Sequence, residues 1–212
     1  MQQKIPDYWN AGLAHLSRDP VMHQLITRYP DSVLTSRGDV FHTLARCIVG
    51  QQVSVASADA VWGRLEQLLH DKHAAMTPQH ILSFSDEDFR SCGFSRQKIA
   101  YMRNIAEFYV AEKLDDMEWH KMSDEEVMRY ITQIKGIGRW SAEMLLIFCL
   151  LRSDVFPLLD IGLQRAMGIH YGVTAKPFDA DHALEVAKQW QPYRSVALWF
   201  LWRSIDPSEV YY

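Results

Sequence analysis

Two helical patterns separated by a glycine-containing turn constrain the fold of this chain more than any other stretch. Ser123 and Glu126 form a capping-box pattern, in which each side chain bonds to the backbone N–H of the other at a helix start. Apolar residues then recur at helical spacing as far as Ile134. Beyond the turn at 135–139, residues 140–151 are apolar on almost every side, which is typical of a buried helix. We therefore expect two helices joined by a tight hairpin.

The hairpin has the features of an anion-binding site built from backbone groups. Its two glycines can adopt positive φ and allow a partner to approach the main chain closely. The N–H groups of the turn and of the following helix start, together with the helix dipole, favour an anion such as a phosphodiester. The predicted contacts are Lys135, Gly136, Gly138, Arg139 and Ser141. The alternative is an ordinary helical hairpin whose glycines only turn the chain.

Four segments of the chain resemble one protein family. Residues 134–142, with the loop at 154–160, resemble the helix-hairpin-helix Gly/Pro-Asp (HhH-GPD) superfamily of DNA glycosylases. Residues 41–54 are similar to that family's first core helix and the Gln-rich turn after it, and residues 190–202 are similar to its C-terminal helix. Within the superfamily, the chain looks most like the 3-methyladenine DNA glycosylase II branch. It departs from the pattern at Lys135, where the family usually has Pro.

The expected fold is all-α, because no stretch alternates between apolar and polar residues as a half-buried strand does. The resemblance implies two helical lobes with a cleft between them for DNA and the active site. Residues 39–154 would form the central lobe, which includes the helix-hairpin-helix motif at 123–151. Residues 1–38 and 155–212 would join to form the terminal lobe.

Asp160 follows a Pro-containing loop and is the predicted catalytic residue. Cleavage of an N-glycosidic bond develops positive charge on the sugar, as glycoside hydrolysis does. A fixed carboxylate stabilises that charge and orients the attacking water. An alkylated purine already carries positive charge, so it can leave without a second carboxyl group to protonate it. The alternative is that Asp160 only caps the helix that begins at Ile161.

Two tryptophans and a glutamine complete the site that the resemblance implies. Trp140 stands where strand-cleaving relatives carry the lysine that forms a Schiff base, which implies a monofunctional glycosylase. Trp140 and Trp202 are expected to line the base pocket, because an aromatic ring attracts a cationic base more than a neutral one. Gln52 is expected to enter the duplex and fill the gap left by the extruded nucleotide. Core packing is the alternative for Trp140, and a plain exposed turn residue is the alternative for Gln52.

The cysteine and histidine residues of this chain limit which metals and cofactors it can bind. Some superfamily members carry an iron–sulfur cluster that needs four cysteine thiolates, and this chain has 3 cysteines in all. We therefore expect no iron–sulfur cluster and no required cofactor, and the sequence contains no His or Cys metal-binding motif. By resemblance, the backbone carbonyls of Thr132, Ile134 and Ile137 would bind a monovalent cation.

The composition favours an intracellular protein that contacts DNA through specific groups rather than through net charge. The cysteines are an odd, well-separated set, which argues for reduced thiols. No apolar run is long enough to span a bilayer, and the N-terminus lacks the apolar core of a signal peptide. We expect a cytoplasmic, DNA-associated protein with no membrane partner. The net charge is −4, so we expect only a modest positive face near the hairpin, to which Arg96, Lys98 and Arg103 contribute.

The sequence therefore predicts a monofunctional DNA glycosylase of base excision repair that acts on double-stranded DNA as a monomer. It would extrude an alkylated purine such as 3-methyladenine or 7-methylguanine, hydrolyse the N-glycosidic bond and leave an abasic site. One alternative is a relative specialised for another damaged base, such as hypoxanthine or ethenoadenine. The other is a non-catalytic helix-hairpin-helix module that only binds DNA, which would need neither Asp160 nor an aromatic pocket.

Overall fold

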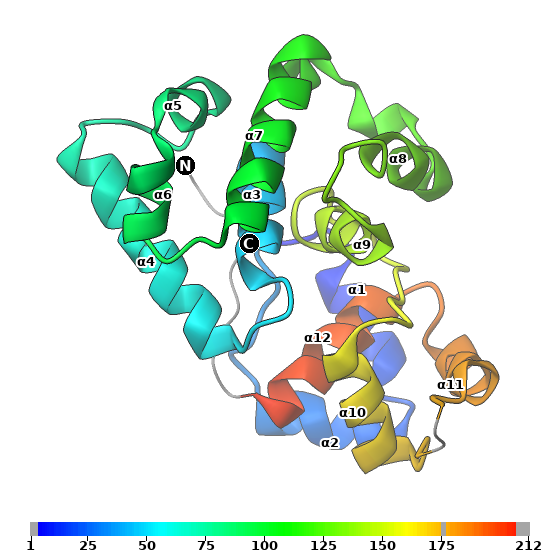
Figure 1. Cartoon of the computed structure of the whole chain (residues 1–212). Coiled ribbons are helices and arrows are strands. Elements are labelled where there is room, and N and C mark those ends of the chain that lie inside the picture. The colour runs from blue at the N-terminus through cyan, green and yellow to red at the C-terminus, as the bar shows by residue number, and fades with distance from the viewer. Residues whose placement is uncertain (1–3, 175–176, 207–212) are drawn as a thin grey trace. The chain divides into compact units, whose positions relative to one another are not determined.

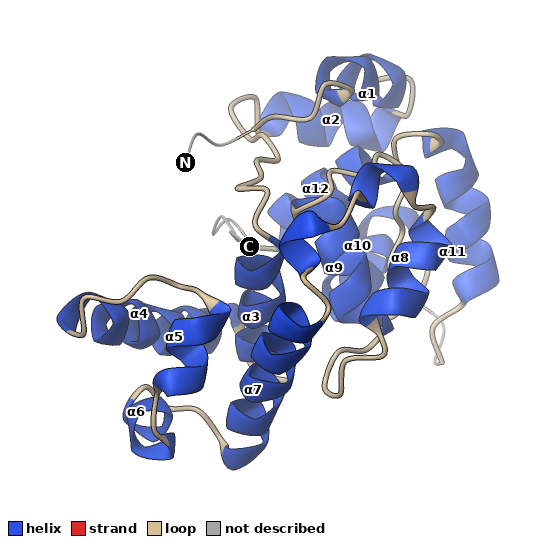
Figure 2. Ribbon diagram, turned by 90° about the horizontal axis from the view of Figure 1, so that it is seen from above, coloured by secondary structure: helices blue, strands red, loops and turns tan. Residues whose placement is uncertain are grey.

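The computed structural model describes residues 4–174 and 177–206, and the regular structure in these residues is helical (Figure 1; Figure 2). An isolated bridge between Lys4 and Ser36 is the nearest approach to a strand in this part of the chain. The prediction of an all-α fold is confirmed. No helix among the described residues is long and apolar enough to cross a membrane. The helices are, in chain order, α1 (Trp9–Leu16), α2 (Pro20–Arg28), α3 (Val40–Gly50), α4 (Val55–Asp71), α5 (Pro78–Ser83), α6 (Asp86–Ser91), α7 (Arg96–Ala111), η1 (Leu114–Asp116), η2 (Trp119–Lys121), α8 (Asp124–Ile131), α9 (Arg139–Phe148), α10 (Ile161–Tyr171), α11 (Ala180–Ala187), η3 (Lys188–Trp190) and α12 (Arg194–Ile205).

The chain divides into two compact units. One comprises the described residues up to Arg37 and from Leu146 onward, and the other comprises Gly38–Leu145. The sequence interpretation put the second boundary in the loop after residue 154, whereas the structure puts it within α9. Because α9 runs without a break across this point, no turn or loop residues mark the change of unit in the sequence.

The unit formed by Gly38–Leu145 is built around α3, in which Val40–Val49 are all buried. α3 packs against α4 and α7, and α7 also packs against α5. The predicted capping box at the start of α8 is present, with both bonds between Ser123 and Glu126 formed. Side-chain caps also begin the five preceding α-helices of this unit, α3 to α7, at Asp39, Ser54, Thr77, Ser85 and Ser95. Local sequence therefore fixes where most of these helices start.

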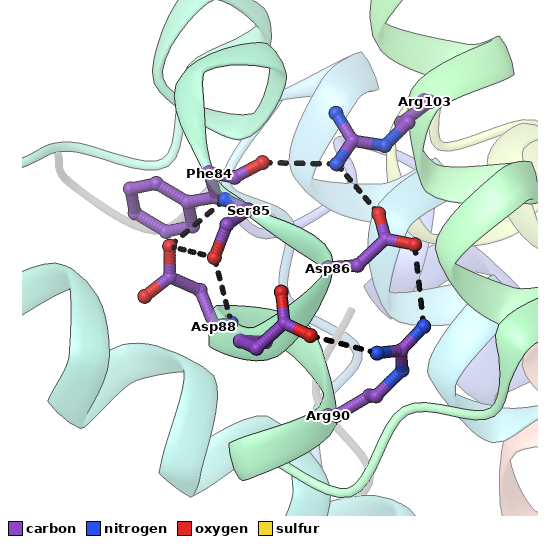
Figure 3. A network of polar contacts seen from close by, with 7 residues as sticks. Phe84, Ser85, Asp86, Asp88, Arg90 and Arg103 are labelled. Atoms are coloured by element: carbon purple, nitrogen blue, oxygen red, sulfur yellow. Dashed lines mark hydrogen bonds and ion pairs between the residues drawn. The ribbon is translucent and has the colours of Figure 1, made fainter.

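A polar network joins α6 and α7 to the chain after α5 (Figure 3). Nη2 of Arg103 donates to the Phe84 carbonyl and to the Asp86 carboxylate, both at 2.9 Å. Asp86 also pairs with Arg90 at 3.5 Å. The sequence interpretation counted Arg103 among the basic residues near the DNA site. In the structure its guanidinium also holds these helices together, through Phe84 and Asp86.

The other unit is built around α12, in which Ser195–Leu201 are all buried. α12 packs against α1, α2 and α10. This helix starts at Arg194, because Tyr193, at φ −121° and ψ 33°, is not in a helical conformation.

Polar contacts join both ends of α10 to the last turns of α12. At the start of α10, the Trp202 indole N–H donates to Asp160 at 2.8 Å. Near the end of α10, Nε2 of His170 lies 2.8 Å from the Ser204 hydroxyl. Burial lowers the pKa of His170, and the positive charge of Arg28 lowers it further. The His170 ring is therefore favoured in its neutral form in the folded protein.

The depressed pKa of His170 predicts a pH dependence of folding stability. Its ordinary value is 6.5, and the folded value lies below it. The neutral His170 ring therefore makes its full contribution to folding stability above about pH 6.5. This contribution is lost as the pH falls through the folded pKa, because the unfolded chain binds the proton more readily than the folded protein does. Between about pH 7.5 and about pH 5, we expect His170→Gln to lose less unfolding free energy than wild type in urea titrations. Equal losses in the two proteins would contradict this assignment.

Candidate active site and DNA-contact elements

Asp160 immediately precedes α10, and two donors fix its carboxylate. Oδ1 accepts one hydrogen bond from the Leu163 backbone N–H at 2.6 Å and another from Nε1 of Trp202 at 2.8 Å. The first is the N-cap bond of α10, so the capping role that the sequence offered as an alternative is present. The side chain is partly exposed. A carboxylate with a fixed orientation is the group that can stabilise a developing positive charge without first reorganising.

Gly162 allows the Trp202 indole to reach Asp160. A Cβ atom on Gly162 would lie 3.0 Å from Oδ1 of Asp160 and 3.1 Å from Cδ1 of Trp202. Contacts this short would force a shift, and both neighbours belong to the hydrogen bond itself. The sequence interpretation missed Gly162. Gly162 could have been noticed as a glycine in the first turn of a predicted helix, because glycine is disfavoured within helices.

Trp202 is an orienting donor as well as an aromatic surface. Its ring stacks on Phe148, with centroids 5.7 Å apart and an interplanar angle of 9°. The sequence predicted only a stacking partner for an extruded base. One face of the indole is packed against Phe148. The hydrogen bond to Asp160 has no local signal, because the two residues are far apart in the chain.

The loop between α9 and α10 is anchored to the start of α12. The Ser195 hydroxyl accepts from the Val155 N–H at 3.0 Å and donates to the Arg152 carbonyl at 2.7 Å. Arg194 donates from Nε and Nη2 to the two carboxylate oxygens of Asp154, at 2.7 and 2.8 Å. Such a bidentate pair is geometrically specific. These contacts fix the path of the chain toward the start of α10.

Two exposed apolar side chains flank Asp160. Leu159 is 64% exposed and Ile161 is 81% exposed. Large apolar side chains that gather beside a polar group often belong to binding surfaces. The sequence interpretation did not single them out, because at the junction of a loop and a helix no periodic pattern separates an exposed Leu or Ile from a buried one.

The two hairpin glycines, between α8 and α9, have different roles. Either glycine can adopt positive φ, and of the two only Gly136 does, at φ +107°. A Cβ on Gly136 would lie 2.4 Å from Cγ of Tyr101, so the protein's own packing requires glycine there. A Cβ on Gly138 would have no neighbour within 4 Å. Gly138 therefore leaves the main chain open to an approaching partner.

The remaining predicted hairpin contacts differ in accessibility. Lys135 and Arg139 are exposed, and Arg139 also pairs with the buried Glu143 carboxylate at 2.9 Å. Ser141 is buried, and its hydroxyl lies 3.5 Å from Nε2 of Gln51. The predicted phosphate contact at Ser141 therefore lies on a buried residue, unlike those at Lys135 and Arg139.

Trp140 and Gln52 belong to the same unit as the hairpin. Trp140 lies in the first turn of α9 and is partly exposed. Gln52 is exposed between α3 and α4 and has φ +56°, which is uncommon for a residue with a side chain. The structure thus brings Asp160 together with Trp202 in one unit. In the other, it brings the hairpin together with Gln51, the neighbour of Gln52.

The residues proposed for a monovalent cation have suitable donor chemistry. Thr132 is the C-cap of α8, and the Ile134 carbonyl accepts from the Ile137 N–H at 2.9 Å. A carbonyl oxygen has two lone pairs, so this bond leaves one for a cation. Among the described residues, no group of three or more His, Cys, Asp or Glu could hold a metal ion, and the three cysteines are buried thiols.

Solved structures of DNA glycosylases share this fold. The Schizosaccharomyces pombe 3-methyladenine DNA glycosylase, in a complex with abasic DNA, matches with a TM-score of 0.77 and 29% identity over 92% of this chain and 96% of that chain. A DNA-3-methyladenine glycosidase from Bacillus halodurans matches with a TM-score of 0.71 and 32% identity, over 96% of this chain and 92% of that chain.

Sequence relatives agree with the structural matches. DNA-3-methyladenine glycosylase 1 of Schizosaccharomyces pombe is 31% identical over 182 residues, which cover 85% of this chain and 79% of that protein. A Bacillus subtilis relative, provisionally named in the same class, is 32% identical, and the match covers 79% of this chain but 59% of that protein. The family model for HhH-GPD superfamily base excision DNA repair proteins matches residues 45–192. The resemblance found in the sequence is confirmed, and the chain belongs to the HhH-GPD superfamily of base excision DNA repair proteins.

Proposed function

We propose that this protein is a monofunctional DNA glycosylase that removes alkylated purines, of the 3-methyladenine and 7-methylguanine type, from double-stranded DNA. The observation that carries the proposal is the Asp160 carboxylate, which Leu163 and Trp202 hold at the start of α10. Membership of a base excision repair superfamily supports the reaction class. The names of the relatives, which are 3-methyladenine glycosylases, support the substrate class.

Asp160 acts on the charge that develops on the deoxyribose. As the N-glycosidic bond breaks, the sugar acquires oxocarbenium character, and a carboxylate close to the anomeric carbon lowers the energy of that state. The same carboxylate orients the attacking water. Because both donors to Asp160 are in place within the protein, the carboxylate needs no reorganisation as the charge develops.

The positive charge on the leaving base also lowers the barrier to cleavage of the N-glycosidic bond. Methylation at N3 or N7 puts positive charge on the purine, so the base departs as a neutral molecule without prior protonation. By resemblance, Trp140 and Trp202 would each present aromatic surface, which attracts such a cationic base. One carboxylate is therefore sufficient.

Trp140 supports hydrolysis without strand cleavage. Cleavage through a Schiff base needs an amine at the position where Trp140 stands, and an indole cannot act as that nucleophile. The product would then be an abasic site in an intact strand.

The hairpin contacts the phosphates of the DNA backbone. Gly138 leaves the main chain open, and the N-terminus of α9 adds its dipole to the local N–H groups. The exposed Lys135 and Arg139 add positive charge. Gln52 enters the duplex beside the extruded nucleotide and fills the gap that it leaves.

A monovalent cation on the carbonyls of Thr132, Ile134 and Ile137 would add positive charge close to the bound phosphate. We propose no other cofactor. The compartment is intracellular, where DNA is found and where the three buried cysteines stay reduced.

The proposed reaction predicts which products appear when the protein is incubated with methylated duplex DNA. Free 3-methyladenine or 7-methylguanine should be released and identified by chromatography. Strand breaks should appear only after alkali, because the enzyme leaves an abasic site rather than a cut. Binding of duplex with no base released from methylated DNA would contradict the proposal, and breaks without alkali would contradict the role of Trp140.

Alanine at the two hairpin glycines should separate stability from DNA binding. Gly136→Ala introduces a Cβ at positive φ and against Tyr101, so we expect a loss of about 1–3 kcal/mol of unfolding free energy in urea titrations. Gly138→Ala should change stability by no more than about 0.5 kcal/mol. It should nevertheless weaken binding to an abasic duplex about tenfold, measured by fluorescence anisotropy, since the new methyl group lies between phosphate and backbone. Unchanged binding by Gly138→Ala would exclude the hairpin as a phosphate contact.

A further inference from the structure

Gln51 connects the turn that carries Gln52 to the hairpin. It is the C-cap residue of α3, and its Nε2 donates to the Gly136 carbonyl at 2.9 Å. The same nitrogen lies 3.5 Å from the Ser141 hydroxyl, so its second hydrogen can be shared with the start of α9. The side chain is partly buried. One amide group therefore bridges two segments that are 85 residues apart in the chain.

A second contact holds the turn that carries Gln52, through the residues that precede it in α3. Nζ of Lys98, on α7, donates to the Val49 carbonyl at 2.7 Å, near the end of α3. The backbone is thus fixed just before Gln51 by α7 and at Gln51 by the hairpin. Gln52 follows directly and keeps its left-handed conformation, which carries strain that persists only where neighbouring contacts impose it.

The hairpin has its own support, independent of Gln51. The Asn104 side-chain amide donates to the Lys135 carbonyl at 2.9 Å, and the Tyr101 ring packs under Gly136. Both residues belong to α7. Removal of the Gln51 amide would therefore leave the hairpin attached to α7, while the turn that carries Gln52 would lose its bond to the hairpin.

We propose that Gln51 is a positioning residue that sets the spacing between Gln52 and the phosphate-binding hairpin, and so determines how efficiently the nucleotide is extruded. This inference rests on the proposed function. Phosphates and base steps are regularly spaced along duplex DNA. If the hairpin holds one phosphate, the insertion of Gln52 depends on a fixed distance from that phosphate. The Gln51 amide provides this constraint, because it bonds to Gly136 within the hairpin.

A purely structural role for Gln51 makes a different prediction. If Gln51 only stabilised its unit, its loss would act independently of Gln52, and it would weaken binding to undamaged duplex as much as it weakens extrusion. If it acts through Gln52, removal of the Gln52 side chain should make Gln51 nearly irrelevant, which a double-mutant cycle detects.

The test compares Gln51→Ala, Gln52→Ala and the double variant in full-length protein. Gln51→Met, which keeps the side-chain length without the amide, serves as a second variant if Gln51→Ala is poorly folded. Extrusion is read from the fluorescence of 2-aminopurine placed beside a methylated purine, and base release is read in a single turnover. We expect Gln51→Ala to lower both about fivefold to tenfold, with binding to undamaged duplex within about twofold of wild type. The double variant should be no worse than Gln52→Ala alone.

Asn104→Ala is the matched control. It removes the hydrogen bond from Asn104 to the Lys135 carbonyl, which does not involve the turn that carries Gln52. The fold reduction in extrusion that it causes should therefore multiply with the reduction caused by Gln52→Ala. Independent, multiplying effects of Gln51→Ala and Gln52→Ala would overturn the inference, and so would wild-type extrusion by Gln51→Ala and Gln51→Met. An absence of extrusion by wild-type protein would also overturn it. If wild type extrudes the base without releasing it, the proposed function fails, while the comparison of extrusion by the variants still decides the role of Gln51.

Discussion

The hydrogen bond from the Trp202 indole to Asp160 is the interaction on which the rest of the candidate active site depends. It joins α12 to the start of α10, and it shares its acceptor atom with the N-cap bond from Leu163. Gly162 leaves room for the indole beside the carboxylate. A single carboxylate oxygen thus starts a helix, joins it to the buried helix of its unit and fixes the orientation of the group proposed to do the chemistry. The capping and catalytic interpretations of Asp160 are therefore compatible.

The other unit places open backbone groups, together with the exposed Lys135 and Arg139, where DNA is proposed to bind. α7 supports the hairpin through Tyr101 and Asn104, and Gly138 leaves the main chain open. This arrangement suits a chain whose net charge is −4. Oriented N–H groups and a helix dipole bind a phosphate locally, so they do not need the large positive surface on which counterion release depends.

Local patterns predicted much of this structure, and long-range side-chain contacts account for what they missed. The all-α fold, the capping box at Ser123 and the cap at Asp160 each follow from residues within one helical turn. The donor role of Trp202 and the bridge from Gln51 join residues distant in the chain, where no periodicity or spacing marks them. The unit boundary inside α9 escaped notice for a related reason, because a continuous apolar helix carries no turn signal.

The central claim is that the charge of Asp160 lowers the barrier to base release. Asp160→Asn tests it most directly, because the amide oxygen can still accept from Leu163 and Trp202 while the negative charge is lost. The measurement is the single-turnover rate of 3-methyladenine release from methylated duplex, with binding to abasic duplex as the control. The account predicts a rate lower by a factor of about 100 or more, with binding largely retained. A variant that released the base as fast as wild type would contradict it.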